Sequence, residues 1–128
     1  MATPTNTKTK VFHRLTTRGD EFTNASVAIE DGRLVLRSPD GNGLGVYNDW
    51  LWFTTRPEFE PPNYGNADYK VEVRVFCDNQ YQTFQIDFQT RPLIQMHNNA
   101  LRLETEDLTV VYAAGYWLGY RLTENGAN

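Results

Sequence analysis

The sequence contains a single cysteine, Cys77, and so has no pair that could form an intrachain disulfide. Its 128 residues must hold their fold through packed side chains, and a chain of this length can bury a sizeable core. We expect Cys77 to be a small buried side chain in a strand. A catalytic thiol would need a histidine or a cationic group beside it.

Long apolar runs are also absent, since no stretch approaches the roughly 18 residues of a membrane-spanning helix. The N-terminal residues lack the apolar segment of a secretory signal peptide. We therefore expect no membrane partner, and a protein that is cytoplasmic or is exported or assembled by another route.

Clusters of lysine and arginine are missing, and the net charge of the chain is −4. Proteins that bind nucleic acids or anionic membranes attract phosphate groups with clustered positive charge. The composition therefore argues against a nucleic-acid partner.

Sequence motifs of catalysis and metal binding are missing as well. There is no G-x-S-x-G, H-E-x-x-H or paired C-x-x-C, and we expect the two histidines, His13 and His97, to be structural or solvated. The segment that begins at Asp40 resembles the start of a calcium-binding EF-hand loop, but its twelfth position is Leu51 instead of glutamate. We expect no catalytic residue, no metal and no cofactor, and lean towards a protein that is not an enzyme.

The sequence does contain alternating apolar and polar residues, interrupted by turn signals about every 8 to 12 residues, which is typical of all-β proteins. The dipeptide Asp31-Gly32 suits a two-residue hairpin turn and places Ile29 opposite Leu34 on an apolar face. The same register pairs Val27 with Leu36 and the opposite charges of Glu30 and Arg33.

Two further hairpins can be aligned in the same way. A turn at residues 78–79 predicts the pairs Tyr69–Phe88, Lys70–Asp87, Val71–Ile86 and Val73–Phe84. A turn at residues 98–99 predicts the pairs Met96–Leu101 and Ile94–Leu103, with the two leucines facing Tyr112 and Val110 of the next strand. A one-residue slip would mix polar and apolar faces, so each pattern specifies its own register.

These hairpins, with strands at residues 11–16, 46–54 and 116–122, predict eight or nine antiparallel strands. We expect a flexible polar tail at residues 1–9, a single β domain at residues 10–124 and a C-terminal tail at residues 125–128. The fold is expected to be a two-sheet sandwich, because the long loops at residues 38–45 and 56–68 suit crossings between sheets. An up-and-down β-barrel is the alternative. In either fold the last strand, residues 116–122, is expected to close the meander formed by the strands before it. The segment EDGRLVLRSPDG and the strand-rich C-terminal part resemble jelly-roll and lectin-like domains in composition, a resemblance that implies no functional residue.

Aromatic residues make up 13% of the chain, and two tryptophans lie two positions apart in residues 46–54. Both faces of this segment are largely apolar, which predicts either a central strand covered on both sides or an exposed row of rings that faces a ligand. Ring faces beside amides and carboxylates are suited to carbohydrate recognition. The candidate ligand-binding residues are Tyr47, Asp49, Trp50, Trp52, Asn63, Tyr64 and Trp117.

The leading hypothesis is therefore a non-catalytic binding module for a carbohydrate. One alternative is a structural or assembly protein, such as a virion or appendage component, in which the aromatic residues form the interface of a homo-oligomer. Another is a small β-barrel that binds or shapes an apolar small molecule. An inhibitor or immunity-type protein that uses the proline-rich loop is a further alternative.

Overall fold

The computed structural model describes residues 7–13, 19–57, 68–77, 79–106 and 108–124, except the side chains of residues 57 and 77. The prediction of a buried Cys77 therefore lies outside the described side chains. The described residues form twelve strands and no helix. In chain order the strands are β1 (Thr7–His13), β2 (Asp20–Thr23), β3 (Ser26–Glu30), β4 (Arg33–Arg37), β5 (Gly43–Tyr47), β6 (Trp50–Pro57), β7 (Tyr69–Cys77), β8 (Gln80–Phe88), β9 (Leu93–His97), β10 (Ala100–Glu104), β11 (Thr109–Tyr112) and β12 (Trp117–Glu124).

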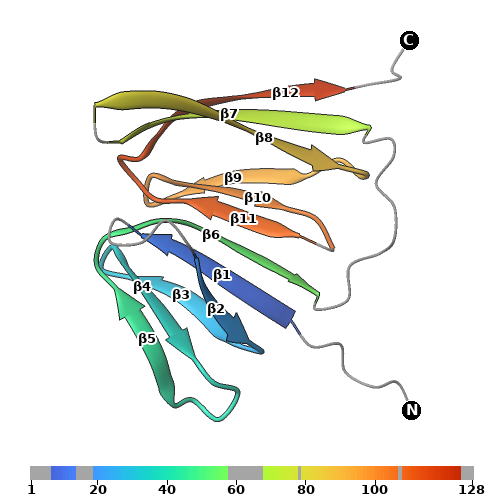
Figure 1. The fold of residues 1–128 in the computed structure, drawn as a ribbon. Coiled ribbons are helices and arrows are strands. Elements are labelled where there is room, and N and C mark those ends of the chain that lie inside the picture. The colour runs from blue at the N-terminus through green and yellow to red at the C-terminus, as the bar shows by residue number, and fades with distance from the viewer. Residues whose placement is uncertain (1–6, 14–18, 58–67, 78, 107, 125–128) are drawn as a thin grey trace, which may run out of the picture.

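The strands form three antiparallel sheets. The largest has six strands in the order β2-β1-β6-β11-β10-β9, and the others have the orders β12-β7-β8 and β3-β4-β5. Figure 1 shows the β12-β7-β8 sheet stacked over β9, β10 and β11, and the β3-β4-β5 sheet on the other side, beside β1, β2 and β6. The two small sheets thus cover opposite faces of the large one.

This architecture confirms the predicted all-β antiparallel class and is consistent with the predicted sandwich. None of the three sheets closes into a barrel within the described strands, so the barrel alternative is wrong. The chain passes from the large sheet to β7 after residue 57, where one crossing was expected. Residues 38–45 instead join neighbouring strands of one sheet, because β5 begins at Gly43 and pairs with β4.

The three predicted hairpins have the registers that the sequence indicates. Ile29 pairs with Leu34 in the β3–β4 hairpin, and Val73 pairs with Phe84 in the β7–β8 hairpin. The predicted pairs of β9 with β10 and of β10 with β11 are also present. Alternation combined with a two-residue turn therefore determines local strand pairing in this chain.

Other boundaries and pairings differ from the prediction. Residues 46–54 are two strands, because a bend at Asn48-Asp49 separates β5 from β6. The last strand pairs with β7 and does not extend the sheet of β9, β10 and β11. Strand β1 begins at Thr7, within the segment assigned to a tail, and pairs with both β2 and β6. These pairings join residues far apart in the chain, which alternation alone does not identify.

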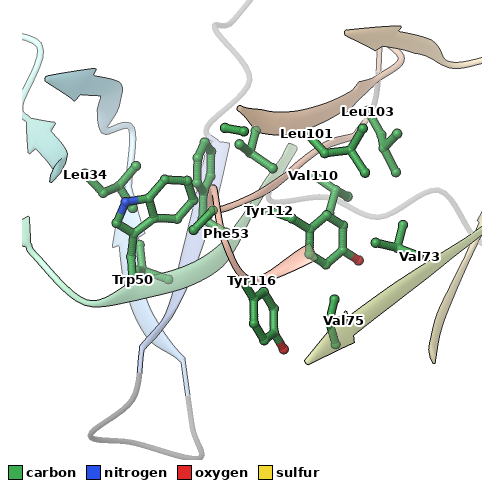
Figure 2. Close-up of a cluster of buried hydrophobic side chains, with 14 of the residues drawn as sticks. Leu34, Trp50, Phe53, Val73, Val75, Leu101, Leu103, Val110, Tyr112 and Tyr116 are labelled. Carbon is green, nitrogen blue, oxygen red and sulfur yellow. The ribbon is translucent and has the colours of Figure 1, made fainter. Parts of the chain in front are cut away.

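The core extends on both faces of β6, the strand that lies between β1 and β11. On one face the ring of Trp52 lies 5.4 Å from that of Phe84 in the β12-β7-β8 sheet. Towards the other small sheet, Trp50 and Phe53 belong to the same buried cluster as Leu34. Figure 2 shows this cluster running from Leu34 past Trp50 and Phe53 to Tyr112 and the valines of β7. The part of the segment that belongs to β6, residues 50–54, therefore lies in a central strand with core residues on both sides.

Candidate functional site

Three tight connections contribute to one cavity: the β3–β4 turn, the bend between β5 and β6, and the β9–β10 turn. The backbone angle φ is 53° at Asp31 and 78° at Gly32, and it is 50° at Asn98 and 66° at Asn99. Glycine, asparagine and aspartate tolerate these left-handed angles better than other residues. The turns therefore require the same residue types whose side chains bind polar ligands.

The cavity between these connections has a volume of about 470 Å³. Trp50, Ala100 and Ala113 are buried residues of its lining, and the small methyl groups of the alanines leave space beside the indole. Its other lining residues are Ile29, Asp31, Gly32, Asn48, Asp49, Asn98 and Ala114. The site thus combines a largely apolar floor with a rim of two carboxylates and two amides.

The indole of Trp50 is 5% exposed, so it cannot serve as an open stacking platform. Its Nε1 donates a hydrogen bond of 3.1 Å to the carbonyl oxygen of Gly32. Its ring lies 5.9 Å from the ring of Phe53. Trp50 therefore closes the inner end of the cavity and fixes the position of the β3–β4 turn.

Trp117 stabilises a second turn at the cavity in a similar way. Its Nε1 donates a hydrogen bond of 2.8 Å to the carbonyl oxygen of Asn99, and Asn98 of the same turn lines the cavity. The indole of Trp117 itself is not among the lining residues. Trp117 therefore positions Asn99, the residue next to Asn98 of the lining.

The remaining predicted site residues lie elsewhere. Trp52 is half-buried and packs against the core, and its ring is stacked 4.1 Å from that of Phe12. The hydroxyl of Tyr47 donates a hydrogen bond of 2.7 Å to Oδ2 of Asp20. Asn63 and Tyr64 lie outside the described residues. Of the predicted set, the structure brings Asp49 and Trp50 into the cavity and places Trp117 behind one of its turns.

Sequence reasoning missed Asp31, Asn48 and Asn98 as members of this site. The sequence identifies Asp31 and Asn98 as turn residues, and it predicts a continuous strand at residues 46–54, where the structure has a bend at Asn48. The turn dipeptides are a visible signal in the sequence, but the end of the fold at which each turn lies depends on how the sheets stack.

A polar cluster outside the cavity joins β1, β2 and β5. His13 Nε2 lies 3.2 Å from Oδ2 of Asp20, the same oxygen that accepts the hydrogen bond from Tyr47. That bond, supported by His13, lowers the pKa of Asp20 from its usual value of 3.8. Burial and the hydrogen bond to Asp20 raise the pKa of Tyr47. The cluster ties the β1–β2 hairpin to the edge of the β3-β4-β5 sheet.

A second hollow, of about 490 Å³, lies on the outer face of the β12-β7-β8 sheet. It is shallower, and it is formed by Glu72, Arg74, Tyr81, Thr83, Leu118, Gly119, Tyr120 and Arg121. Most of these side chains are long and exposed, whereas the turn cavity has buried residues and a hydrogen-bonded indole in its wall. The turn cavity is therefore the better candidate for a preformed site.

Comparison with known proteins reveals no matching family model, no matching curated protein and no matching solved structure. Within the described part of the chain, no group of three or more histidine, cysteine, aspartate or glutamate residues could hold a metal ion. The same residues contain no helix that is long and apolar enough to cross a membrane.

Proposed function

We propose that the protein is a non-catalytic binding module whose turn cavity binds a carbohydrate unit. The observation that carries the proposal is the lining of the cavity, where Asp31, Asn48, Asp49 and Asn98 surround an apolar floor formed by Trp50 and alanines. This mode of binding differs from stacking on a platform of exposed rings, because amides and carboxylates would recognise the sugar.

The chemistry of these groups is suited to sugar hydroxyls. A carboxylate accepts hydrogen bonds at two oxygens, and an amide both donates and accepts, so neighbouring hydroxyls of a sugar ring can be paired with them. The indole N–H of Trp50 is already bonded to Gly32, so Trp50 would contribute its apolar surface to the C–H groups of the ring. The volume falls within the range of about 300 to 1,000 Å³ that small-molecule sites occupy.

The geometry of the site would also reduce the entropy lost on binding. Asp31 and Asn98 lie in two-residue turns, and indole hydrogen bonds hold the carbonyl oxygens of their neighbours Gly32 and Asn99. Side chains that project from fixed turns lose less freedom when a ligand orders them.

The experiment is a titration of the isotopically labelled protein with a panel of neutral and acidic mono- and oligosaccharides, followed through backbone amide shifts. We expect a sugar in the panel to shift the amides of Asp31, Gly32, Asp49 and Asn98 together and saturably. Shifts confined to other surfaces, or no saturable shift with any sugar, would contradict the proposal.

Two variants test the assignment of the site. Asp31→Asn with Asp49→Asn keeps the side-chain shapes but removes both carboxylate acceptors, and Ala114→Phe fills the cavity from an exposed position. Both should weaken binding at least tenfold. Asp40→Asn, an exposed carboxylate in the β4–β5 connection, is the matched control and should bind as the native chain does.

A further inference from the structure

The outer sheet edge formed by β8 differs from the other sheet edges of the protein. Edge strands expose unpaired backbone groups, and proteins protect them by shortness, bulges, proline or charge. Four of the six edge strands, β2, β3, β5 and β9, have four or five residues. The fifth, β12, has eight residues, but it carries a bulge between Trp117 and Gly119 and the charges of Arg121 and Glu124.

Strand β8 has little of this protection. It has nine residues, QYQTFQIDF, which pair with β7 without a bulge and include one charge, Asp87, but no proline, glycine or lysine. Among the described residues, no backbone hydrogen bond reaches its free side. At about 3.4 Å per residue the exposed edge is roughly 30 Å long.

The side chains of β8 are also incompletely covered in the single chain. Phe84 and Ile86 are half-buried, whereas their partners on β7, Val73 and Val71, are fully buried. On the outer face Tyr81 is 71% exposed, and its ring lies 4.7 Å from that of Phe76. A strand added beside β8 would cover the remaining apolar surface of the inner face.

We propose that β8 pairs antiparallel with β8 of a second copy of this chain, so that two three-stranded sheets become one six-stranded sheet. The pairing is centred on Phe84, whose side chain is half-buried in the single chain. In this register Phe84 faces its own copy and Gln82 faces Ile86 on the inner face, while Tyr81 faces Asp87 and Thr83 faces Gln85 on the outer face. All nine residues pair, and the single carboxylate of each strand faces a neutral residue.

The contact is closed, because both copies use the same edge and a two-fold axis passes between the two copies of Phe84. The product is therefore a dimer and not a filament. The interaction does not depend on the turn cavity, so an experiment can contradict the proposed dimer without contradicting the proposed carbohydrate site, and the reverse.

The test is the solution mass of the full chain, measured by light scattering and sedimentation from about 1 µM to 1 mM. We expect the mass to rise with concentration from 14.8 kDa to twice that value. A mass that remains 14.8 kDa throughout would overturn the proposal.

Two double variants test the register. Thr83→Glu with Gln85→Glu places like charges opposite each other twice across the two-fold axis, whereas Thr83→Glu with Gln85→Lys places opposite charges there. Like charges on facing strand positions are destabilising and opposite charges are favourable. The dimer of the first variant should have a dissociation constant at least tenfold higher than that of the second.

Within one chain both variants place a glutamate opposite Arg74 at position 83. Position 85 lies opposite Glu72, so Gln85→Glu adds a like-charge pair within the chain and Gln85→Lys an opposite-charge pair, and the stability of each variant is measured separately. Circular dichroism provides the check that each variant remains folded. Equal dissociation constants for the two folded variants would show that the dimer, if present, uses another surface or register, and would overturn the pairing of β8.

Discussion

The indole Nε1 of Trp50 donates a hydrogen bond to the carbonyl oxygen of Gly32 and thereby ties the start of β6 to the β3–β4 turn. The same chemical arrangement recurs where Trp117 donates to the carbonyl oxygen of Asn99 in the β9–β10 turn. The two indoles differ in burial, since Trp50 belongs to the core and Trp117 is half-buried. Together they hold two of the turns that border the cavity.

Trp50→Phe should lower the free energy of unfolding by about 2 to 3 kcal/mol, because it leaves a cavity in the core and removes the donor for Gly32. Trp117→Phe loses the same kind of bond at a more exposed place and should cost about 1 kcal/mol or less. Urea unfolding of the two variants measures the difference. Equal losses would contradict the assignment of Trp50 to the core.

Gly32→Ala should destabilise the protein by about 1 to 2 kcal/mol, because Gly32 has a φ of 78° and a Cβ is disfavoured in that left-handed conformation. No neighbouring atom would touch the new methyl group, so backbone strain is the only cost. Gly43→Ala is the matched control, since Gly43 has no positive φ and also has open space around it. We expect the control to be neutral or slightly stabilising in thermal unfolding.

The hairpins could be predicted because their information is local. In the β3–β4 and β9–β10 hairpins, residue types that tolerate left-handed angles mark the turn, and alternation of apolar residues sets the register. The pairing of β6 with β1 and β11, and of β12 with β7, has no such local marker. Alternation indicates which face of a strand is buried, but not which distant strand lies beside it.

The candidate site was predictable only in part, for the same reason. Asp49 and Trp50 were found because an aromatic ring beside a carboxylate is visible in the sequence. Asp31 and Asn98 belong to separate hairpins, and they line one cavity only because the stacking of the sheets brings both turns to it. Trp52 has the same residue type as Trp50, but its stacking on Phe12 is a result of strand pairing.

Tyr112→Phe should raise the free energy of unfolding by about 1 kcal/mol. The side chain of Tyr112 is fully buried, and its hydroxyl has no hydrogen-bond partner among the described residues. A buried polar group without a partner costs desolvation energy that phenylalanine does not incur. Chemical denaturation measures the change, and a loss of stability would show that the hydroxyl has a partner, such as a buried water.

Tyr47→Phe makes the same chemical change at a hydroxyl that is bonded, and it should lower the melting temperature in a pH-dependent way. The hydroxyl donates to Asp20 and is the main cause of the lowered pKa of that carboxyl group. The folded state therefore holds the proton of Asp20 less tightly than the unfolded state does. The ionised carboxyl group of Asp20 therefore stabilises the folded state at pH values above its usual pKa of 3.8. This stabilisation is lost as the pH falls through and below that value.

At alkaline pH the change in stability depends on the ionisation of Tyr47 itself. Burial is the first cause of its raised pKa, and the bond to Asp20 is the second, so the unfolded chain ionises first as the pH rises above the usual value of 10.0. The native protein then loses stability, whereas the phenylalanine variant has no hydroxyl at this position to ionise. The difference in melting temperature between the two proteins should be largest at about pH 5 to 8 and should shrink below about pH 4 and above about pH 10. A difference that stays constant from pH 3 to 11 would show that the hydroxyl of Tyr47 does not stabilise the ionised carboxylate of Asp20.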